Sequence, residues 1–122
     1  MKTASLVYFG VLNFLLFARV PLNLFPEAWE GAAMHYSPAF HLLSFTLLAV
    51  LMLAAGWPVS RTTLLALMVA YSVGTEVVQG LLPYRSCELS DCLNDLAGIA
   101  AGTAMLWPPR LPTIAALGAR GA

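Results

Sequence analysis

The chain has 122 residues, of which 60% are apolar and 10% are charged, and its six basic and six acidic side chains give a formal net charge of zero. Soluble domains are about 45–50% apolar and about 25% charged, so this composition, with a mean hydropathy of +0.80, excludes an ordinary soluble catalytic domain. The zero net charge excludes the basic face that nucleic-acid binding requires. A helical crossing needs about 20 apolar residues, which leaves room for about four crossings. We therefore expect an all-α integral membrane protein, a compact four-helix bundle formed by one domain over residues 1–122.

Four apolar segments bounded by charged residues or proline are the predicted membrane spans. The first follows Lys2, and we interpret it as an uncleaved helix rather than a signal peptide, because further spans follow and it lacks a small-x-small cleavage site. The second lies between Pro38 and Pro58, and the fourth ends at Pro108. The predicted spans cover about residues 4–20, 39–57, 62–82 and 91–107.

The basic residues predict the orientation of these spans, because positive charge is retained on the cytoplasmic side of a membrane. With the N-terminus inside, four basic residues lie in the cytoplasm and two lie outside. Those inside are Lys2, Arg61, Arg110 and Arg120, and those outside are Arg19 and Arg85. We therefore expect both termini in the cytoplasm.

Polar residues on three of the predicted helices converge on the outer boundary of the membrane. At 100° per residue, each set falls within about a 100° arc of its helix. We expect the three polar stripes to face one another around an outward-opening cavity. The stripes are Ser37, His41 and Ser44 on the second helix, Ser72, Thr75, Glu76 and Gln79 on the third, and Asp91, Asn94, Asp95, Gly98 and Gly102 on the fourth.

Ionisable side chains in these stripes are the candidate site. A charged side chain at membrane depth costs about 2.5–3.5 kcal/mol, so it is usually paired or functional. An imidazole, with an unperturbed pKa of about 6.5, can give or take a proton near neutrality, and Arg85 offers a planar fork of donors for an anionic head group. The candidate catalytic or positioning residues are His41, Glu76, Asp91 and Asp95, and the candidate substrate-binding residues are Gln79, Arg85 and Asn94.

Asp91 and Asp95 are one helical turn apart and would repel each other if both were ionised. Three uses of the pair stay open: an acid/base pair, a divalent-cation site completed by Glu76 or His41, or an anchor for Arg85. The His-Glu-x-x-His spacing of zinc enzymes is absent, so we assign no metal and no cofactor.

Two closely spaced pairs near the fourth span have structural interpretations. Cys87 and Cys92 are not favoured as a disulfide, because a regular helix through both would point them apart. A cysteine nucleophile with His41 as its base ranks below the arginine–carboxylate interpretation. Gly98 and Gly102 form a small-xxx-small pattern, which predicts close helix packing within the chain.

The segment 71–102 resembles the VanZ-like family of small bacterial membrane proteins. The family pattern is Glu, Gln three residues later, Arg six after that, Asp six after the Arg, a polar residue four later, and two glycines spaced by four. Here these places are filled by Glu76, Gln79, Arg85, Asp91, Asp95, Gly98 and Gly102, and the family's upstream histidine with an aromatic four residues later corresponds to His41 and Phe45. The chain departs from the pattern in two places, with Ser37 and Pro38 where the family has Asp-Lys, and with Asp95 where Asn is common.

The resemblance implies a multi-pass protein of the bacterial cytoplasmic membrane. The orientation predicted from the basic residues then places the polar site on the outer, periplasmic side. The family's namesake is linked to low-level teicoplanin resistance, while many members have no link to antibiotics. We expect the protein to contact membrane lipids and its site to bind an anionic amphiphile or a lipid-linked envelope component. Whether the site also processes this ligand chemically, and the oligomeric state of the protein, stay open. The alternative is a non-enzymatic structural or interaction subunit in which the polar residues clasp the helices together.

Overall fold

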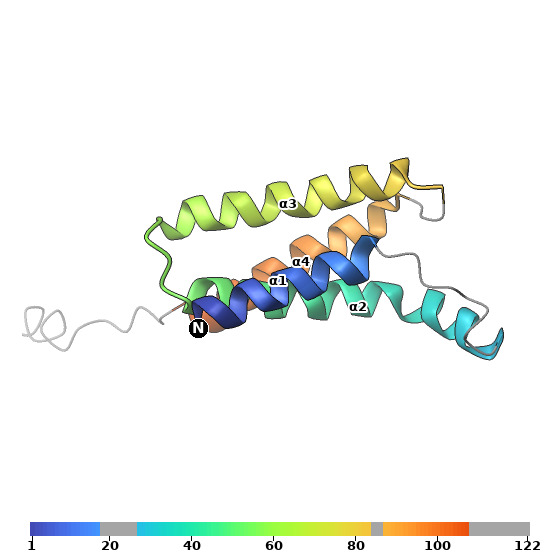
Figure 1. Cartoon of the computed structure of the whole chain (residues 1–122), viewed down its shortest axis with the longest axis horizontal. Helices are drawn as coiled ribbons and strands as arrows, with labels where there is room; N and C mark the ends of the chain where they lie inside the picture. Colours follow the sequence, from blue (N-terminus) through green and yellow to red (C-terminus); the bar gives the residue numbers. More distant parts are fainter. Residues whose placement is uncertain (18–26, 84–86, 108–122) are drawn as a thin grey trace, which may run out of the picture.

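The computed structural model describes residues 1–17, 27–83 and 87–107, without the side chains of residues 27–37. Over these residues the fold is four α-helices without a strand, which confirms the all-α expectation. Successive helices run in opposite directions along one long axis (Figure 1). The helices are α1 (Lys2–Phe17), α2 (Glu27–Ala54), α3 (Arg61–Leu81) and α4 (Leu89–Leu106).

The second helix begins earlier than expected, whereas its apolar part, Pro38–Ala54, begins at the start of the predicted span. The prediction that Pro38 precedes this helix is wrong, because α2 begins at Glu27 and Pro38 lies inside it. Proline removes one backbone hydrogen bond from a helix, and the remaining turns of this long helix continue through that position. At the other end, Gly56 adopts a positive φ of 63°. This left-handed conformation is the usual glycine terminator, so α2 stops at Ala54.

Among the residues that the structure describes, α3 is the helix long and apolar enough to cross a membrane, with 21 residues. It begins where predicted because Ser60 caps it, with the Thr63 backbone N–H donating to Ser60 Oγ at 3.0 Å. Shorter apolar helices cover Lys2–Phe17 and Pro38–Ala54. The long apolar helix indicates a membrane protein, and the four-crossing topology stays a prediction.

The closest helix pair is α2 and α4, which pack through the two predicted glycines. A Cβ atom at Gly98 would lie 2.5 Å from the carbonyl oxygen of Leu42, and one at Gly102 would lie 2.5 Å from that of Thr46. Real side chains essentially never approach backbone so closely. The prediction that these glycines allow close packing within the chain is therefore confirmed.

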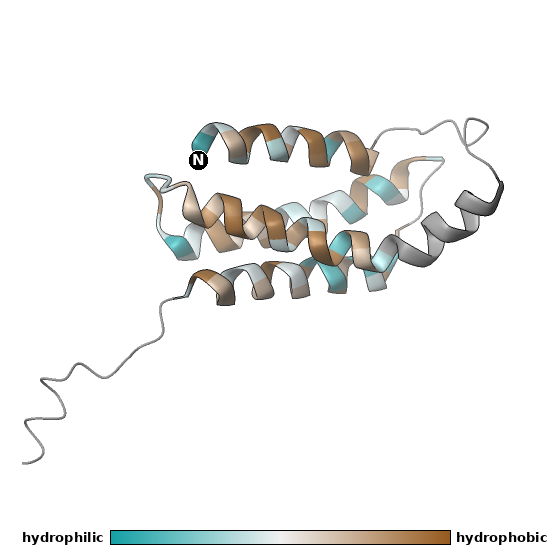
Figure 2. Ribbon diagram, turned by 90° about the horizontal axis from the view of Figure 1, so that it is seen from below, coloured by the Kyte–Doolittle hydropathy of each residue, from teal (hydrophilic) through white to brown (hydrophobic). Residues whose placement is uncertain are grey.

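The bundle places apolar side chains outside and polar ones inside, most clearly on α3. Val73, Val77 and Leu81 are exposed, whereas Glu76 and Gln79 are buried. Figure 2 shows apolar residues along the lengths of the helices and hydrophilic residues towards the ends of the bundle. A bundle in water has the opposite distribution. The apolar core is correspondingly small and consists of Leu12, Leu16, Phe45, Leu48, Ala49, Met68 and Ile99.

Candidate functional site

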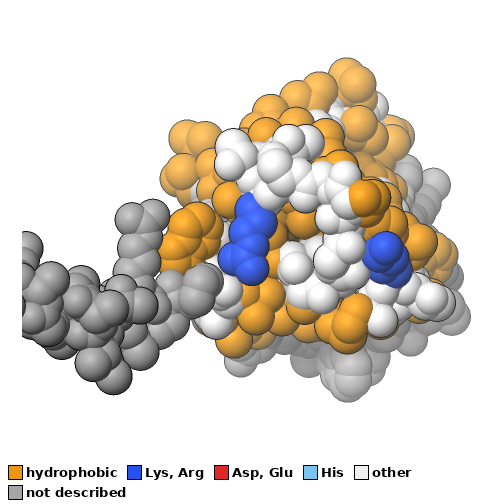
Figure 3. All heavy atoms as spheres, turned by 90° about the vertical axis from the view of Figure 1, so that its left-hand side faces the viewer, with side chains coloured by type: hydrophobic (Ala, Val, Ile, Leu, Met, Phe, Trp, Pro, Cys, Tyr) orange, Lys and Arg blue, Asp and Glu red, His pale blue; other side chains and the backbone are white. Residues whose placement is uncertain are grey.

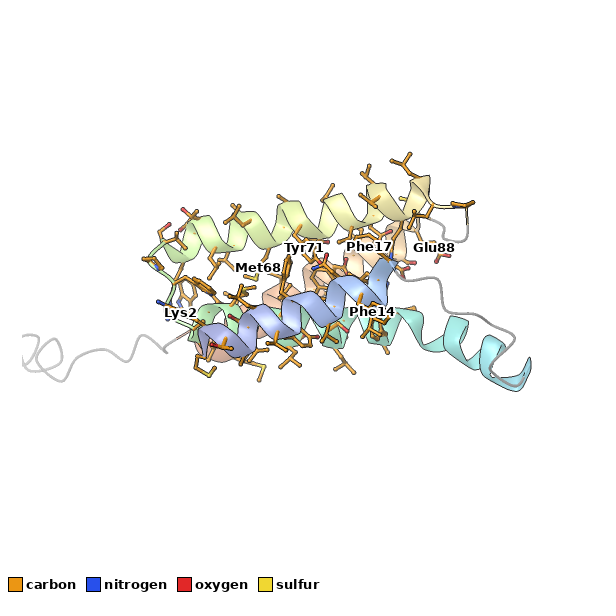
Figure 4. The ribbon with its side chains drawn as sticks, in the orientation of Figure 1. Lys2, Phe14, Phe17, Met68, Tyr71 and Glu88 are labelled. Atoms are coloured by element: carbon orange, nitrogen blue, oxygen red, sulfur yellow. The ribbon has the colours of Figure 1, made fainter. Side chains whose placement is uncertain are left out.

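Charge is separated between the two ends of the bundle. At one end, Lys2 Nζ lies 5.7 Å from the centre of the Trp57 ring, and Arg61 Nη1 donates to the Leu106 carbonyl at 3.5 Å. Among its coloured residues, Figure 3 shows basic groups and no acidic side chain on this end. Figure 4 places Glu88 at the opposite end from Lys2. The acidic side chains that the structure describes, Glu76, Glu88, Asp91 and Asp95, belong to the end of α3 and the beginning of α4.

The centre of the candidate site is a contact between His41 on α2 and Asp95 on α4, which are 4% and 0% exposed. His41 Nδ1 lies 2.7 Å from Asp95 Oδ1, the geometry in which a ring N–H donates to a carboxylate. The second oxygen of Asp95 accepts a hydrogen bond from Ser72 Oγ at 3.1 Å. Asp95 therefore joins all three helices α2, α3 and α4.

The other ring nitrogen of His41 faces Asp91, one turn earlier on α4. Nε2 lies 3.6 Å from Asp91 Oδ2, which is an ion-pair distance but too long for a direct hydrogen bond. Asp91 Oδ1 is buried and accepts no hydrogen bond from the residues that the structure describes. The imidazole thus lies between the two carboxylates that the sequence placed on one face of the helix.

Glu76, on α3, completes the group. Its Oε2 accepts the backbone N–H of Glu88 at 3.2 Å, while Oε1 is buried without a hydrogen-bond partner in the described part of the chain. Glu76, His41 and Asp95 each offer one ligand-type atom, and these three atoms lie within 4.8 Å of one another. We call the four side chains His41, Glu76, Asp91 and Asp95 the polar cluster.

Two of the predicted substrate-binding residues, Gln79 and Asn94, make their hydrogen bonds away from the polar cluster. Gln79 is buried, and its Nε2 donates to the Leu16 carbonyl at 2.9 Å, which joins α3 to α1. Asn94 Nδ2 donates to the Ser90 carbonyl of its own helix at 2.8 Å, so the structure does not bring Asn94 into the cluster. Arg85 and the Ser37 side chain lie outside the described residues.

The hydrogen bond of Ser72 is a feature of the site that the sequence does not predict. Ser72 was placed on the polar stripe but not in the site, although it lies one turn before Glu76 and hydrogen-bonds to Asp95. Both cysteines are free, as expected; Cys87 is exposed, and Cys92 Sγ lies 4.0 Å from Ser72 Oγ. Both nitrogens of His41 face carboxylates, so the structure does not form the alternative cysteine–histidine pair.

An apolar groove of about 620 Å³ runs between α3 and α4. Its lining includes Val69, which lies three residues before Ser72 on α3, and Leu96, which follows Asp95 on α4, but no residue of the polar cluster. The polar stripes predict an outward-opening cavity with a polar lining. This groove has an apolar lining, so it is not that cavity. The lining consists of Leu65, Val69, Leu96, Ile99, Ala100, Thr103, Ala104 and Trp107.

The described chain is thus an all-α bundle with an apolar exterior, one helix of membrane-spanning length and a buried polar cluster near one end. The model of the VanZ/LLP1 family matches residues 1–111, and the chain belongs to that family. The family expected from the sequence motif is therefore confirmed. No curated protein and no solved structure matches the chain.

Proposed function

We propose that this chain crosses the bacterial cytoplasmic membrane four times, with both termini in the cytoplasm, and that its polar cluster binds the head group of an anionic amphiphile at the outer side. The observation that carries the proposal is a buried cluster of four ionisable side chains on α2, α3 and α4, in a bundle where α3 and α4 also border an apolar groove. Such a combination suits a ligand with a polar head and an apolar chain. A lipid-linked envelope intermediate belongs to this chemical class.

The exterior of the bundle supports four crossings rather than one. Each helix exposes a large apolar side chain: Phe14, Leu43, Leu81 and Met105 are between 67% and 79% exposed. Contiguous apolar surface of this kind is unfavourable in water. It is the ordinary exterior of a helix bundle in lipid, where association depends on close packing and polar contacts rather than on an apolar core.

The separation of charge supports the orientation. The basic end carries Lys2 and Arg61, and positive charge marks the cytoplasmic side. The polar cluster then lies towards the outer side of the membrane.

An impermeant maleimide should test this orientation through Cys87, which is exposed next to the acidic end. In a Cys92→Ser background, intact cells should be labelled at Cys87, because the loop before α4 is outside. As a matched control, Val59→Cys in a chain without Cys87 and Cys92 should react only after permeabilisation, since exposed Val59 lies in the loop at the other end. The reverse labelling pattern would overturn the orientation.

Electrostatics sets a condition on the ligand. The polar cluster has three carboxyl groups and one imidazole, so its carboxylates alone repel an anion. Binding of an anionic head group therefore requires added positive charge from protonated His41, from Arg85 as the sequence predicts, or from a bound cation. The groove volume lies within the range of about 300–1,000 Å³ typical of ligand sites.

Arg85→Ala is expected to weaken binding of a polyprenyl phosphate by at least about tenfold, the effect of losing roughly 1.4 kcal/mol, because it removes positive charge. Glu76→Gln removes one repelling carboxylate, so without a bound cation it should not weaken that binding. Binding is measured on the full chain in lipid nanodiscs, with a neutral diacylglycerol as the comparison ligand and teicoplanin as a third. Folded protein and melting temperature are measured in parallel. Asn13→Ala is the matched polar control, because Asn13 Nδ2 bonds only within α1, to the Phe9 carbonyl at 2.7 Å. Equal binding of phosphate and neutral lipid by the wild type would reject the proposal.

A specific observation favours a second function, a structural or interaction subunit. The buried hydrogen bonds His41–Asp95, Ser72–Asp95 and Gln79–Leu16 join all four helices, as a clasp would. Two results together would favour this structural function over ligand binding. The wild type would bind none of the ligands, and the variants Glu76→Gln and Arg85→Ala would be lost from the membrane.

A further inference from the structure

We propose that the polar cluster binds one divalent transition-metal ion, with His41, Glu76 and Asp95 as its ligands and Asp91 beside them. The inference rests on the proposed function in that it concerns the same site, and the experiment below separates the failure of one from the failure of the other. The ligand-type atoms of the three residues lie within 4.8 Å of one another, and all three residues are buried.

The spacing of these atoms is close to that of a coordination shell. Zinc–ligand bonds of about 2.0–2.2 Å place neighbouring ligand atoms roughly 3–3.5 Å apart. His41 Nδ1 and Asp95 Oδ1, at 2.7 Å, are closer than this, so a bound ion would replace the hydrogen bond between them and hold the two atoms slightly further apart. The other ring nitrogen, Nε2, would keep its 3.6 Å contact with Asp91 Oδ2 outside the shell. Glu76 supplies the third ligand atom, within 4.8 Å of the other two, so binding would draw its carboxylate towards the ion.

Unsatisfied acceptor atoms are the second and independent observation. Glu76 is 4% exposed and Asp91 is 8% exposed, yet Glu76 Oε1 and Asp91 Oδ1 accept no hydrogen bond from the described residues. Buried polar atoms are normally paired, and an unpaired one points to a water or an ion. A cation bound in the polar cluster would supply the partner that these two buried oxygens lack.

The negative charge of the polar cluster also favours binding of a divalent cation. Three buried carboxyl groups surround a single imidazole, and the basic side chains that the structure describes, Lys2 and Arg61, lie at the opposite end. A buried ion costs several kcal/mol unless it is paired. A dication compensates two carboxylates at once, and it also turns a cluster that repels anions into one that attracts a phosphate or carboxylate head group.

The ligand types indicate which ion. Imidazole together with carboxylates suits Zn²⁺ and Mn²⁺, whereas Mg²⁺ and Ca²⁺ prefer oxygen ligands alone. The ligands come from α2, α3 and α4, so the bound ion joins three helices. Zn²⁺ and Mn²⁺ should therefore raise the melting temperature more than Mg²⁺ or Ca²⁺ at the same concentration.

The test uses the full chain in nanodiscs, freed of metal by EDTA and titrated with Mn²⁺ by electron paramagnetic resonance and with Zn²⁺ by calorimetry. We expect saturable binding of one ion per chain and an imidazole signature in zinc X-ray absorption. Glu76→Gln and His41→Gln should each weaken binding by at least about tenfold. Glu88→Gln is the matched control, because it removes an acid at the same end while keeping the backbone N–H that donates to Glu76. Its affinity should fall much less than that of Glu76→Gln.

Equal affinity in the wild type, Glu76→Gln and His41→Gln, all folded by circular dichroism, would overturn the metal site. So would a loss of affinity in Glu88→Gln as large as in Glu76→Gln. Polyprenyl phosphate binding is then measured with EDTA and with the ion. Tight binding in EDTA retains the proposed function without the metal, whereas metal binding without any lipid binding retains the metal site and removes the proposed function.

Discussion

Replacing Asp95 with alanine is expected to lower the free energy of unfolding by about 3–5 kcal/mol, the usual cost of removing one partner from a buried ion pair. Asp95 is fully buried and contacts both His41 and Ser72. Its loss removes two hydrogen bonds and leaves the imidazole of His41 beside a cavity. Equilibrium unfolding of the full chain in mixed micelles measures the effect.

Two milder variants identify the origin of this loss. Ser72→Ala removes one hydrogen bond to Asp95 and should cost about 1 kcal/mol. Asp95→Asn keeps the shape and one acceptor oxygen but removes the charge, so it should be more stable than Asp95→Ala. If Asp95→Ala were as stable as the control Asn13→Ala, the polar cluster would not hold the helices together, and the clasp function would be rejected. If Asp95→Asn stays folded but no longer binds Mn²⁺, the negative charge of Asp95 is needed for metal binding and not for stability.

The inward face of α3 could be predicted from the sequence because polar residues in an otherwise apolar helix have one favourable direction. Ser72, Thr75, Glu76 and Gln79 recur at helical spacing, and all four are buried. Lipid solvates the apolar face, so the polar stripe must find partners inside the bundle. Periodicity alone therefore determines the face, although it does not determine the partner.

The partners depend on tertiary packing and could not be predicted. His41 contacts Asp95 and Asp91 rather than forming a direct pair with Glu76, because α2 approaches α4 most closely. Asn94 shares an arc with Asp95, yet its amide bonds to its own helix. The start of α2 was missed for a local reason: Pro38 was interpreted as a boundary, although a long helix can lose one backbone hydrogen bond and continue.

Replacing Gly98 with alanine is expected to cost about 1–3 kcal/mol through overpacking and to disturb the polar cluster as well. The new Cβ would lie 2.5 Å from the Leu42 carbonyl oxygen and 2.9 Å from the Thr46 backbone nitrogen, neither of which can move without shifting α2. His41 is next to Leu42 on α2, and Asp95 lies one turn before Gly98 on α4. Moving the two backbones apart therefore lengthens the His41–Asp95 contact, and Mn²⁺ affinity should fall together with stability.

Gly74→Ala is the matched control for this prediction, since a Cβ at Gly74 meets nothing within 4 Å. Alanine is favoured over glycine in a helix by up to about 1 kcal/mol, so this variant should be slightly more stable than the wild type. It should also bind Mn²⁺ as the wild type does. Opposite effects of one methyl group on α3 and on α4 would show that the approach of α2 to α4 sets the geometry of the polar cluster. Equal stability of the two variants would instead show that the backbones tolerate a side chain at Gly98, and the cluster geometry would then need another cause.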